Sequence, residues 1–343
     1  MHITHVNLAK GFRGGERQTA ILIKELGKQP NLSQQLVCRA DSPLRAELNK
    51  VPNLSFSDAN HQFDGHFKAS KTDVVHAHEA KAVHWAWLHK QLRKTPYLLT
   101  RRVDAPIKDK WLNKQTYSQA SARVAISNII RGIILEKHWG NVDLVFSVKG
   151  DLSHDPAATA KIKQAFAGKT LVGHVGALVD KHKGQKIIIE SARQLANSHP
   201  HLQFLCLGDG KDKDELMALS EDLPNLTWLG FKTNVGDYIH AFDYFVFPSR
   251  NEGLGSSLLD VIDAQVPIIA SDAGGIPDII RHEETGLSIP AGDASALTNA
   301  IKRLDQDAAL QQQLVAGATQ HLQAFTPGHM AEQYLELYKR ALS

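Results

Sequence analysis

Short apolar runs alternate with amphipathic helical patterns along nearly all of this 343-residue chain. In 16–28, for example, Leu22, Ile23 and Leu26 recur at the spacing that places apolar side chains on one face of a helix. Strands joined through helices usually pair in parallel, because a long crossover is needed to bring the chain back to the same end of a sheet. The alternation therefore predicts an α/β fold with doubly wound parallel sheets.

The strand and helix pattern occurs in both halves of the chain. The first half has expected strands at 3–8, 35–38, 74–76, 97–100, 124–126 and 144–146. The second half has expected strands at 171–175, 203–207, 226–229, 244–247 and 267–270, with helices at 184–197, 255–264 and 293–304. Two such sets predict two Rossmann-like domains facing across a cleft.

The domain boundaries follow from the polar segments between these sets. We expect a first domain at 1–155, a second at 156–326, and a C-terminal helix at 327–343 that packs back toward the first domain. The linker is expected within 149–159, which contains a glycine and a proline. An apolar content of 43% and a charged content of 22% are ordinary for a globular protein. Ligands of open α/β sheets bind beyond the carboxyl ends of the strands, so we expect the chemistry in the cleft.

The net charge of +3 is unevenly distributed. Residues 1–150 carry a net +11 and residues 151–343 a net −8, and 81–114 is the most basic segment. A basic half can bind an anionic partner, such as a membrane surface, a nucleic acid or an anionic glycolipid. The alternative, that the charges are solvated helix faces, stays equally open.

Several functional classes are disfavoured. Two distant cysteines cannot form a disulfide framework or a cysteine metal cluster. His76 and His78 look like the end of a strand running into a loop, so one ring is expected to be structural and the other to point into the cleft, rather than both holding zinc. The N-terminus lacks a signal-peptide pattern, and 308–331, which lacks charged side chains, contains five glutamines. We therefore expect a cytoplasmic protein.

Two glycine-rich segments are candidates for phosphate binding. Gly14 and Gly15 follow the first strand and precede a helix, whose free N–H groups favour anions. The segment lacks the Gly-Lys-Ser/Thr of a Walker loop and could equally be a tight turn. No dinucleotide-binding fingerprint is found at 173–176 or 208–210, which disfavours a nicotinamide-dependent enzyme.

The most informative segment is 247–260, where an apolar strand leads through a glycine-rich turn into a helix. Glu252 and Asp260 flank this turn at a separation of eight positions. Between them lie Gly253, Gly255, Ser256 and Ser257. Glycines free the backbone, and serine amides and hydroxyls can receive oxyanions. Two acids around a phosphate-binding turn suit a ligand with diols on both sides of a diphosphate, and a nucleotide sugar is such a ligand.

This segment, followed by 266–278, resembles the signature of the family 4 retaining glycosyltransferases (glycosyl transferases group 1) of GT-B fold. That signature is Glu-x7-Glu, then a strand and a Gly-Gly-x-Pro turn. Further matches to the family extend over nearly the whole chain, at 14–17, 73–79, 100–104, 175–184, 207–210, 229–231 and 243–249.

The resemblance implies roles for individual residues. Glu252 would bind the sugar hydroxyls and support the developing charge, and His78 would lie at the reacting centre. Asp260 would bind the ribose hydroxyls, and Lys183 the diphosphate. The remaining donor-binding positions would be Gly14, Gly15, Gly253, Gly255, Ser256 and Ser257.

Two positions depart from the family pattern. Asp260 replaces the usual second glutamate, and Ala177 stands where many members have arginine. Losing a charge-assisted contact commonly costs ~1.5–3 kcal/mol. Arg101 or Arg102 is expected to compensate by binding phosphate or acceptor.

The resemblance implies a metal-independent hexosyltransferase, without a cofactor, that retains the anomeric configuration and favours a UDP-sugar. Its acceptor would be a glycan or glycolipid of lipopolysaccharide core or another cell-surface polysaccharide, bound by the N-terminal domain. The basic half would then contact the inner face of the cytoplasmic membrane peripherally. An epimerase or hydrolase of the same fold is the alternative, and a nucleic-acid-binding protein is much less favoured. Sugar, base and linkage depend on loops that vary within one fold.

Overall fold

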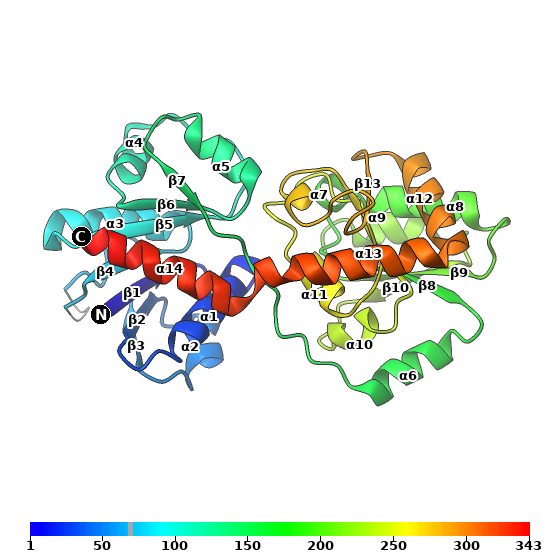
Figure 1. Cartoon of the computed structure of the whole chain (residues 1–343), viewed down its shortest axis with the longest axis horizontal. Coiled ribbons are helices and arrows are strands. Elements are labelled where there is room, and N and C mark those ends of the chain that lie inside the picture. Colours follow the sequence, from blue (N-terminus) through cyan, green and yellow to red (C-terminus); the bar gives the residue numbers. More distant parts are fainter. Residues whose placement is uncertain (68–70) are drawn as a thin grey trace. The chain divides into compact units, whose positions relative to one another are not determined.

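The chain forms two units in a computed structural model that describes residues 1–67 and 71–343. Unit 1 comprises Met1–Val148 and Phe325–Ser343, and unit 2 comprises Lys149–Ala324. Figure 1 labels the elements of both units. Each unit has its own parallel sheet and its own buried core.

Unit 1 is built on a parallel sheet that has seven strands within the described residues, in the order β3-β2-β1-β4-β5-β6-β7. Its strands are β1 (His2–Asn7), β2 (Ser33–Cys38), β3 (Leu54–Asp58), β4 (Val74–Ala77), β5 (Tyr97–Arg101), β6 (Ala122–Ala125) and β7 (Val142–Leu144). Its helices are α1 (Gly14–Leu26), α2 (Pro43–Leu48), α3 (Ala80–Arg93), α4 (Trp111–Ser118), α5 (Asn128–Leu135) and α14 (Pro327–Leu342). The order reverses at β1 and β4, and ligands of such sheets bind at this switch point.

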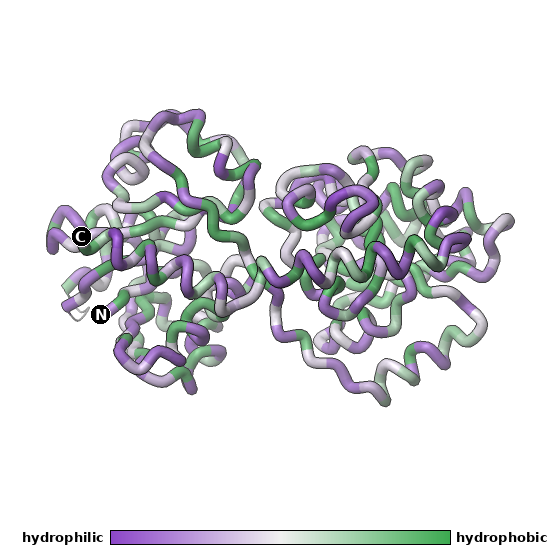
Figure 2. Tube along the Cα trace, viewed as in Figure 1, coloured by the Kyte–Doolittle hydropathy of each residue, from purple (hydrophilic) through white to green (hydrophobic). Residues whose placement is uncertain are grey.

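The last helix, α14, belongs to unit 1 although it follows unit 2 in the sequence. It contacts α1, β4 and β5 (Figure 1). Hydrophilic and hydrophobic residues alternate along it (Figure 2), and its apolar face buries Met330, Tyr334, Leu337 and Tyr338. Burying one large apolar side chain stabilises a fold by about 1.5–3 kcal/mol, so α14 contributes substantially to unit 1.

Unit 2 contains a parallel sheet with the order β10-β9-β8-β11-β12-β13. Its strands are β8 (Thr170–Val175), β9 (Leu202–Leu207), β10 (Leu226–Gly230), β11 (Tyr244–Phe247), β12 (Ile268–Ser271) and β13 (Leu287–Ile289). Its α-helices are α6 (Pro156–Ala165), α7 (Asp180–Lys183), α8 (Gln185–Leu195), α9 (Lys213–Ala218), α10 (Val235–Ile239), α11 (Ser257–Asp263), α12 (Ala294–Gln306) and α13 (Ala308–His321). Short 3₁₀ helices lie at Ile276–Asp278 and Leu322–Phe325.

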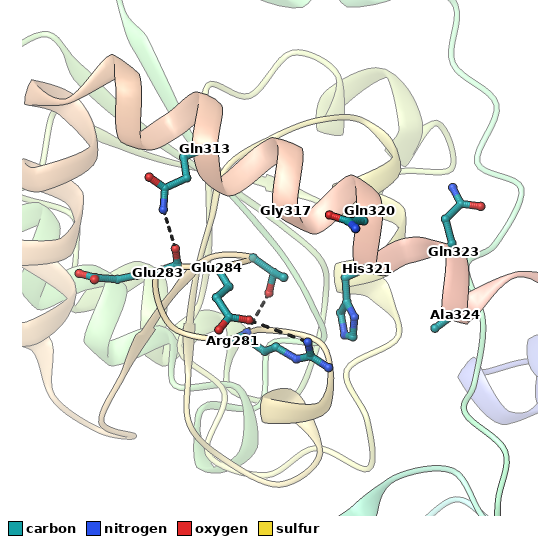
Figure 3. A pocket seen from close by; sticks show the side chains of 10 residues that line it. Arg281, Glu283, Glu284, Gln313, Gly317, Gln320, His321, Gln323 and Ala324 are labelled. Carbon is teal, nitrogen blue, oxygen red and sulfur yellow. Dashed lines mark hydrogen bonds and ion pairs between the residues drawn. The ribbon is translucent and has the colours of Figure 1, made fainter.

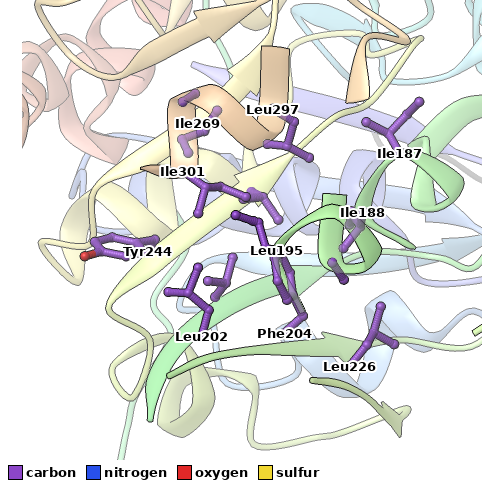
Figure 4. Close-up of a cluster of buried hydrophobic side chains, with 14 of the residues drawn as sticks. Ile187, Ile188, Leu195, Leu202, Phe204, Leu226, Tyr244, Ile269, Leu297 and Ile301 are labelled. Carbon is purple, nitrogen blue, oxygen red and sulfur yellow. The ribbon is translucent and has the colours of Figure 1, made fainter. Parts of the chain in front are cut away.

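The core of unit 2 lies between its sheet and the helices α8 and α12 (Figure 4). Leu195 from α8 and Ile301 from α12 are fully buried there, together with Phe204 of β9. The apolar stripes seen in the sequence at 184–197 and 293–304 are thus the surfaces that cover the sheet. This packing fixes the strand ends from which the site is built.

The structure confirms the predicted fold class of two doubly wound parallel α/β sheets. Sequence reasoning missed β3 and β13, one edge strand of each sheet. The pattern in β3 is hidden because this edge strand has polar Ser55, Ser57 and Asp58 in place of an apolar run. The strand expected at 144–146 is found at Val142–Leu144.

The boundary between the units lies after Val148 rather than after 155. The intervening residues pack on unit 2: the N–H of Asp155 donates to Asp237 Oδ1 over 2.7 Å, and a Cβ on Gly236 would lie 2.3 Å from the carbonyl oxygen of Ser153. Part of the linker expected within 149–159, around Ser153 and Asp155, therefore packs against α10 of unit 2.

Candidate functional site

The glycine-rich turn after β11 is held by the turn after β12. The N–H of Gly275 donates to the carbonyl of Glu252 over 2.9 Å. Gly274 has a φ of +58°, and a Cβ at this position would lie 2.1 Å from the same carbonyl oxygen. Glycine is therefore required at position 274 by the close approach of the two turns, which fixes the backbone from which the Glu252 side chain projects.

Lys183 and Glu252 form an ion pair through Nζ and Oε1. Their side chains are mostly buried, with exposed fractions of 23% and 13%. Lys183 Nζ also lies 5.4 Å from the centre of the Phe247 ring. Lys183 ends α7, and Gly184 follows with a φ of +68°, which brings it against the carbonyl of Pro248. The fold thus joins the two residues to which the family resemblance assigns diphosphate and sugar.

The other acid of the predicted motif, Asp260, is buried in α11 with 7% of its surface exposed. Its Oδ1 accepts a hydrogen bond of 2.7 Å from the N–H of Gly150. Ser256 and Ser257, at the start of α11, and Gly253 are partly exposed, whereas Gly255 is buried with a φ of +83°. The turn is therefore accessible at its serines, while one oxygen of Asp260 already serves the fold.

A cavity of about 290 Å³ opens at the carboxyl ends of β8, β9 and β10. It is lined by Val175, Gly176, Ala177, Leu207, Gly208, Asp209, Phe231, Lys232 and Val235. Phe231 is 72% exposed, so its ring is accessible to a ligand in this cavity. The size and the exposed ring suit a nucleobase or nucleoside. Sequence reasoning did not assign Phe231, Lys232 or Val235 to the site; an aromatic side chain directly after a strand was the available signal.

In unit 1, Gly14 and Gly15 form the first turn of α1. A Cβ on Gly15 would lie 3.4 Å from Cδ of Arg102, so the arginine side chain runs across this turn. The carboxylate of Glu16 accepts from the N–H of Arg13 over 2.9 Å and complements the helix N-terminus. The anion site predicted at this turn therefore contains both the guanidinium group of Arg102 and the carboxylate of Glu16.

The two candidate arginines differ in their contacts. Arg101 donates to the hydroxyl of Tyr117 over 3.2 Å and to the carbonyl of Ala105. Arg102 donates from Nη1 to Ser147 over 3.3 Å, while its Nε and Nη2 are buried and have no hydrogen-bond partner among the described residues. Burial lowers the pKa of Arg102. Arg101 Nε is likewise buried without a partner among the described residues, so each arginine has a buried donor left for a ligand, and Arg102 has two.

The histidine pair lies at the carboxyl end of β4, where the strand leads into a loop. His76 lies on β4 and His78 directly follows it, and both rings are buried side by side with centroids 3.9 Å apart. His5 of β1 joins them, because its Cα pairs with that of His76 across the two strands. The strand direction continues beyond Ala77, so the two alternate residues point to the same face of the sheet.

The three histidines could each offer a ring nitrogen to a metal ion, with these atoms within 4.8 Å of one another. The rings are, however, already hydrogen-bonded. His76 contacts Tyr338 and Thr100 at 2.7 and 2.8 Å, and His5 contacts His78 and Gln34, both at 3.0 Å. Burial lowers the pKa of His78, and the neighbouring histidines and the charge of Arg102 add to this shift. This donor set fits a hydrogen-bonded network better than a metal centre.

A second cavity in unit 2, of about 670 Å³, is lined by polar residues (Figure 3). The carbonyl of Glu283 accepts from Gln313 over 3.0 Å, and Arg281 pairs with Glu284 at 3.9 Å. A Cβ on Gly317 would lie 2.0 Å from the carbonyl oxygen of Glu284. These contacts tie the turn before β13 to α13, which is a structural role.

Comparisons with known proteins connect this geometry to a family. Residues 169–307 match the family Glycosyl transferases group 1. The lipopolysaccharide core biosynthesis glycosyltransferase LpsD of Rhizobium meliloti is 28% identical over 232 residues, which cover 66% of this chain and 66% of LpsD. The matches to the first four curated relatives span 26% to 66% of those proteins' own length.

Solved structures share the fold over nearly the whole chain. Anabaena Alr3699/HepE in complex with UDP superposes with a TM-score of 0.84 at 18% identity, covering 98% of this chain and 99% of that one. A glycosyltransferase from Rickettsia africae superposes with a TM-score of 0.85 at 17% identity, covering 100% and 98%. The chain has the GT-B fold of these proteins, and residues 169–307 of its second unit match the glycosyl transferases group 1.

Proposed function

We propose that this protein is a retaining glycosyltransferase that moves a hexose from a nucleoside diphosphate sugar, with UDP as the favoured nucleotide, to a glycan or glycolipid acceptor. The observation that carries the proposal is the Lys183–Glu252 pair within the segment that matches the group 1 glycosyl transferases. A lysine and a glutamate held on neighbouring turns can bind, respectively, a diphosphate and the hydroxyls of an attached sugar.

The donor is proposed to bind along the strand ends of unit 2. The nucleobase would stack on Phe231, and the ribose would contact Asp260. The diphosphate would bind Lys183 and the backbone N–H groups near Ser256 and Ser257. The UDP named in the structure of Anabaena Alr3699/HepE, which shares the fold, supports the choice of nucleotide.

The reaction is proposed to proceed on one face of the sugar, with retention at the anomeric carbon. The bond from that carbon to the diphosphate oxygen breaks, an acceptor hydroxyl oxygen forms the new bond, and its proton leaves with the diphosphate. Lys183 and the backbone amides would stabilise the leaving diphosphate, and no step uses a metal ion. Glu252 would support the positive charge that develops on the sugar.

The acceptor is proposed to bind unit 1, whose sequence segment 1–150 carries a net +11. Trp111 is 69% exposed there, and Lys108, Lys110 and Lys114 beside it are also exposed. An exposed tryptophan among lysines suits the interface of an anionic membrane. The described residues contain no helix with the length and apolar character needed to span a bilayer. We propose a peripheral enzyme of lipopolysaccharide core or related polysaccharide synthesis on the cytoplasmic face, consistent with the name of LpsD.

Donor binding is tested by thermal shift with UDP, GDP, ADP, NAD and a panel of nucleotide sugars. A ligand at a hundred times its dissociation constant adds about 2.7 kcal/mol of stability. We expect a shift with UDP and with one UDP-sugar, and Glu252→Ala should weaken only the binding of the sugar-bearing form. A shift with NAD alone, or with none of these compounds, would contradict the proposal.

Transfer is tested with the donor so identified and truncated lipopolysaccharide as acceptor, in the presence of EDTA. We expect product with the same anomeric configuration as the donor, read by proton NMR, and no loss of rate in EDTA. Donor turnover at the same rate without acceptor would instead indicate a hydrolase or an epimerase.

A further inference from the structure

A hydrogen-bonded chain of three side chains in unit 1 ends at His78. It begins at Gln34 on β2, whose side chain is 99% buried. Its Nε2 donates to the carbonyl of Ile23 over 3.1 Å. This bond fixes which end of the amide is oxygen, since a carbonyl can only accept. Gln34 Oε1 therefore faces the ring of His5, at 3.0 Å from Nε2.

The orientation of Gln34 determines the protonation of both histidines in the chain. Because Oε1 of Gln34 accepts, Nε2 of His5 must carry the proton. In a neutral ring Nδ1 of His5 is then an acceptor. It lies 3.0 Å from Nε2 of His78, so Nε2 of His78 must donate. A neutral His78 is left with an unprotonated Nδ1.

Both rings are neutral at ordinary pH. Burial lowers the pKa of His5 to about 4. Burial, the neighbouring histidines and Arg102 lower the pKa of His78 well below its usual range. The two neutral rings and the amide thus allow one arrangement of protons, in which each bond has one donor and one acceptor.

Nδ1 of His78 is buried and has no hydrogen-bond partner among the described residues. Nε and Nη2 of Arg102 are also buried and have no hydrogen-bond partner among the described residues. The charge of Arg102 is one of the causes that lower the pKa of His78. A hydroxyl group can satisfy an acceptor and a donor at once, by donating to one and accepting from the other. The unmet groups therefore suit a hydroxyl-bearing ligand.

We propose that Gln34 and His5 are positioning residues, which hold His78 with Nε2 protonated so that Nδ1 accepts a hydrogen bond from a substrate hydroxyl. The identity of the hydroxyl as one of a sugar rests on the proposed function. The tautomer itself does not, because the bonds within unit 1 set it. His78 in this state can accept a hydrogen bond but cannot donate one from Nδ1.

The tautomer is measured by ¹⁵N NMR on the full chain labelled at histidine, at pH 7.5. The His78 signals are identified by their absence from the spectrum of His78→Gln. We expect a protonated Nε2 and an unprotonated Nδ1 for His78. A proton on Nδ1 of His78 in the unsubstituted protein would overturn the proposal.

Two substitutions each break a different hydrogen bond of the chain that sets the His78 tautomer. Gln34→Met keeps a long side chain but removes the acceptor for His5, and His5→Leu removes the acceptor for His78. Each should convert His78 from one tautomer to a mixture. The matched control is Gln35→Met: Gln35 is buried on the same strand, but adjacent strand residues point to opposite faces. An unchanged His78 tautomer in folded Gln34→Met protein would overturn the proposal even if His5→Leu fails to fold.

Activity separates this inference from the proposed function. Transfer by Gln34→Met should fall several-fold to about tenfold in kcat, the range for one lost neutral hydrogen bond, with Gln35→Met unchanged. An unchanged kcat in Gln34→Met would contradict the positioning role. Absence of transfer by the unsubstituted protein would contradict the proposed function, whereas the NMR result would still decide the tautomer.

Discussion

Lys183 and Glu252 are 69 positions apart in the sequence but form a direct ion pair in unit 2. Lys183 is the last residue of α7, the short helix after β8, and Glu252 lies in the turn after β11. The strands β8 and β11 are neighbours in the sheet. The pairing preorganises both side chains in the absence of ligand. A diphosphate would compete with Glu252 for the ammonium group, which links binding of phosphate to release of the carboxylate toward the sugar.

Lys183→Met is expected to weaken binding of UDP by roughly 10- to 150-fold, because a charge-assisted contact worth about 1.5–3 kcal/mol is lost. The measurement is isothermal titration calorimetry. Lys181→Met, two residues earlier in the same helix and exposed, is the matched control and should bind normally. Equal losses in both variants would mean that general charge, rather than the Lys183 position, determines affinity.

Gly274→Ala is expected to destabilise unit 2 by at least about 1–2 kcal/mol. The positive φ is unfavourable for alanine, and the new Cβ meets the carbonyl of Glu252. By contrast, Gly132→Ala lies in an exposed turn of α5 with nothing within 4 Å and should stabilise by about 0.5–1 kcal/mol. Urea unfolding measures both, and a stabilising Gly274→Ala would show that the two turns do not constrain each other.

Phe231→Ala is expected to weaken UDP binding by roughly 5- to 150-fold, since stacking of a base on an aromatic ring is worth about 1–3 kcal/mol. Stability should change by less than about 0.5 kcal/mol, because the ring is 72% exposed. Phe63→Ala, at a position 69% exposed in unit 1, controls for the loss of an exposed ring. Unchanged UDP affinity in Phe231→Ala would place the base elsewhere.

The free energy of unfolding is expected to decrease as the pH is lowered from 6.5 to 4, and His174 contributes to this decrease. Its ring is buried in β8 with a contact of 3.0 Å to the carbonyl of Val246, and burial lowers its pKa to about 4. The unfolded chain then binds more protons than the folded one within this window, so the free energy of unfolding rises with pH. One such histidine accounts for about 2 kcal/mol between pH 7 and pH 5.

The check is urea unfolding of the unsubstituted protein and of His174→Asn at pH 7 and pH 5. The variant should lose less stability between the two pH values, whatever its stability at pH 7. An identical pH dependence in both proteins would show that His174 is not responsible.

Local patterns in the sequence were sufficient for the fold class and for the segment around Glu252. Alternating strands and amphipathic helices encode the parallel sheets because each pattern reports which face of an element is buried. The glycine-rich turn encodes its own shape, as the positive φ of Gly255 illustrates. The edge strand β3 was missed because three of its five residues, Ser55, Ser57 and Asp58, are polar.

Contacts between residues that are distant in the sequence were decided only by the tertiary structure. His5 and His78 are 73 positions apart, and His5 and Gln34 are 29 apart, so no spacing along the chain indicates that they share one hydrogen-bonded network. The position of the His76 and His78 rings side by side was not predicted for the same reason. Strand pairing in the sheet sets the register that places these side chains together, and register is determined by the packing of the whole unit.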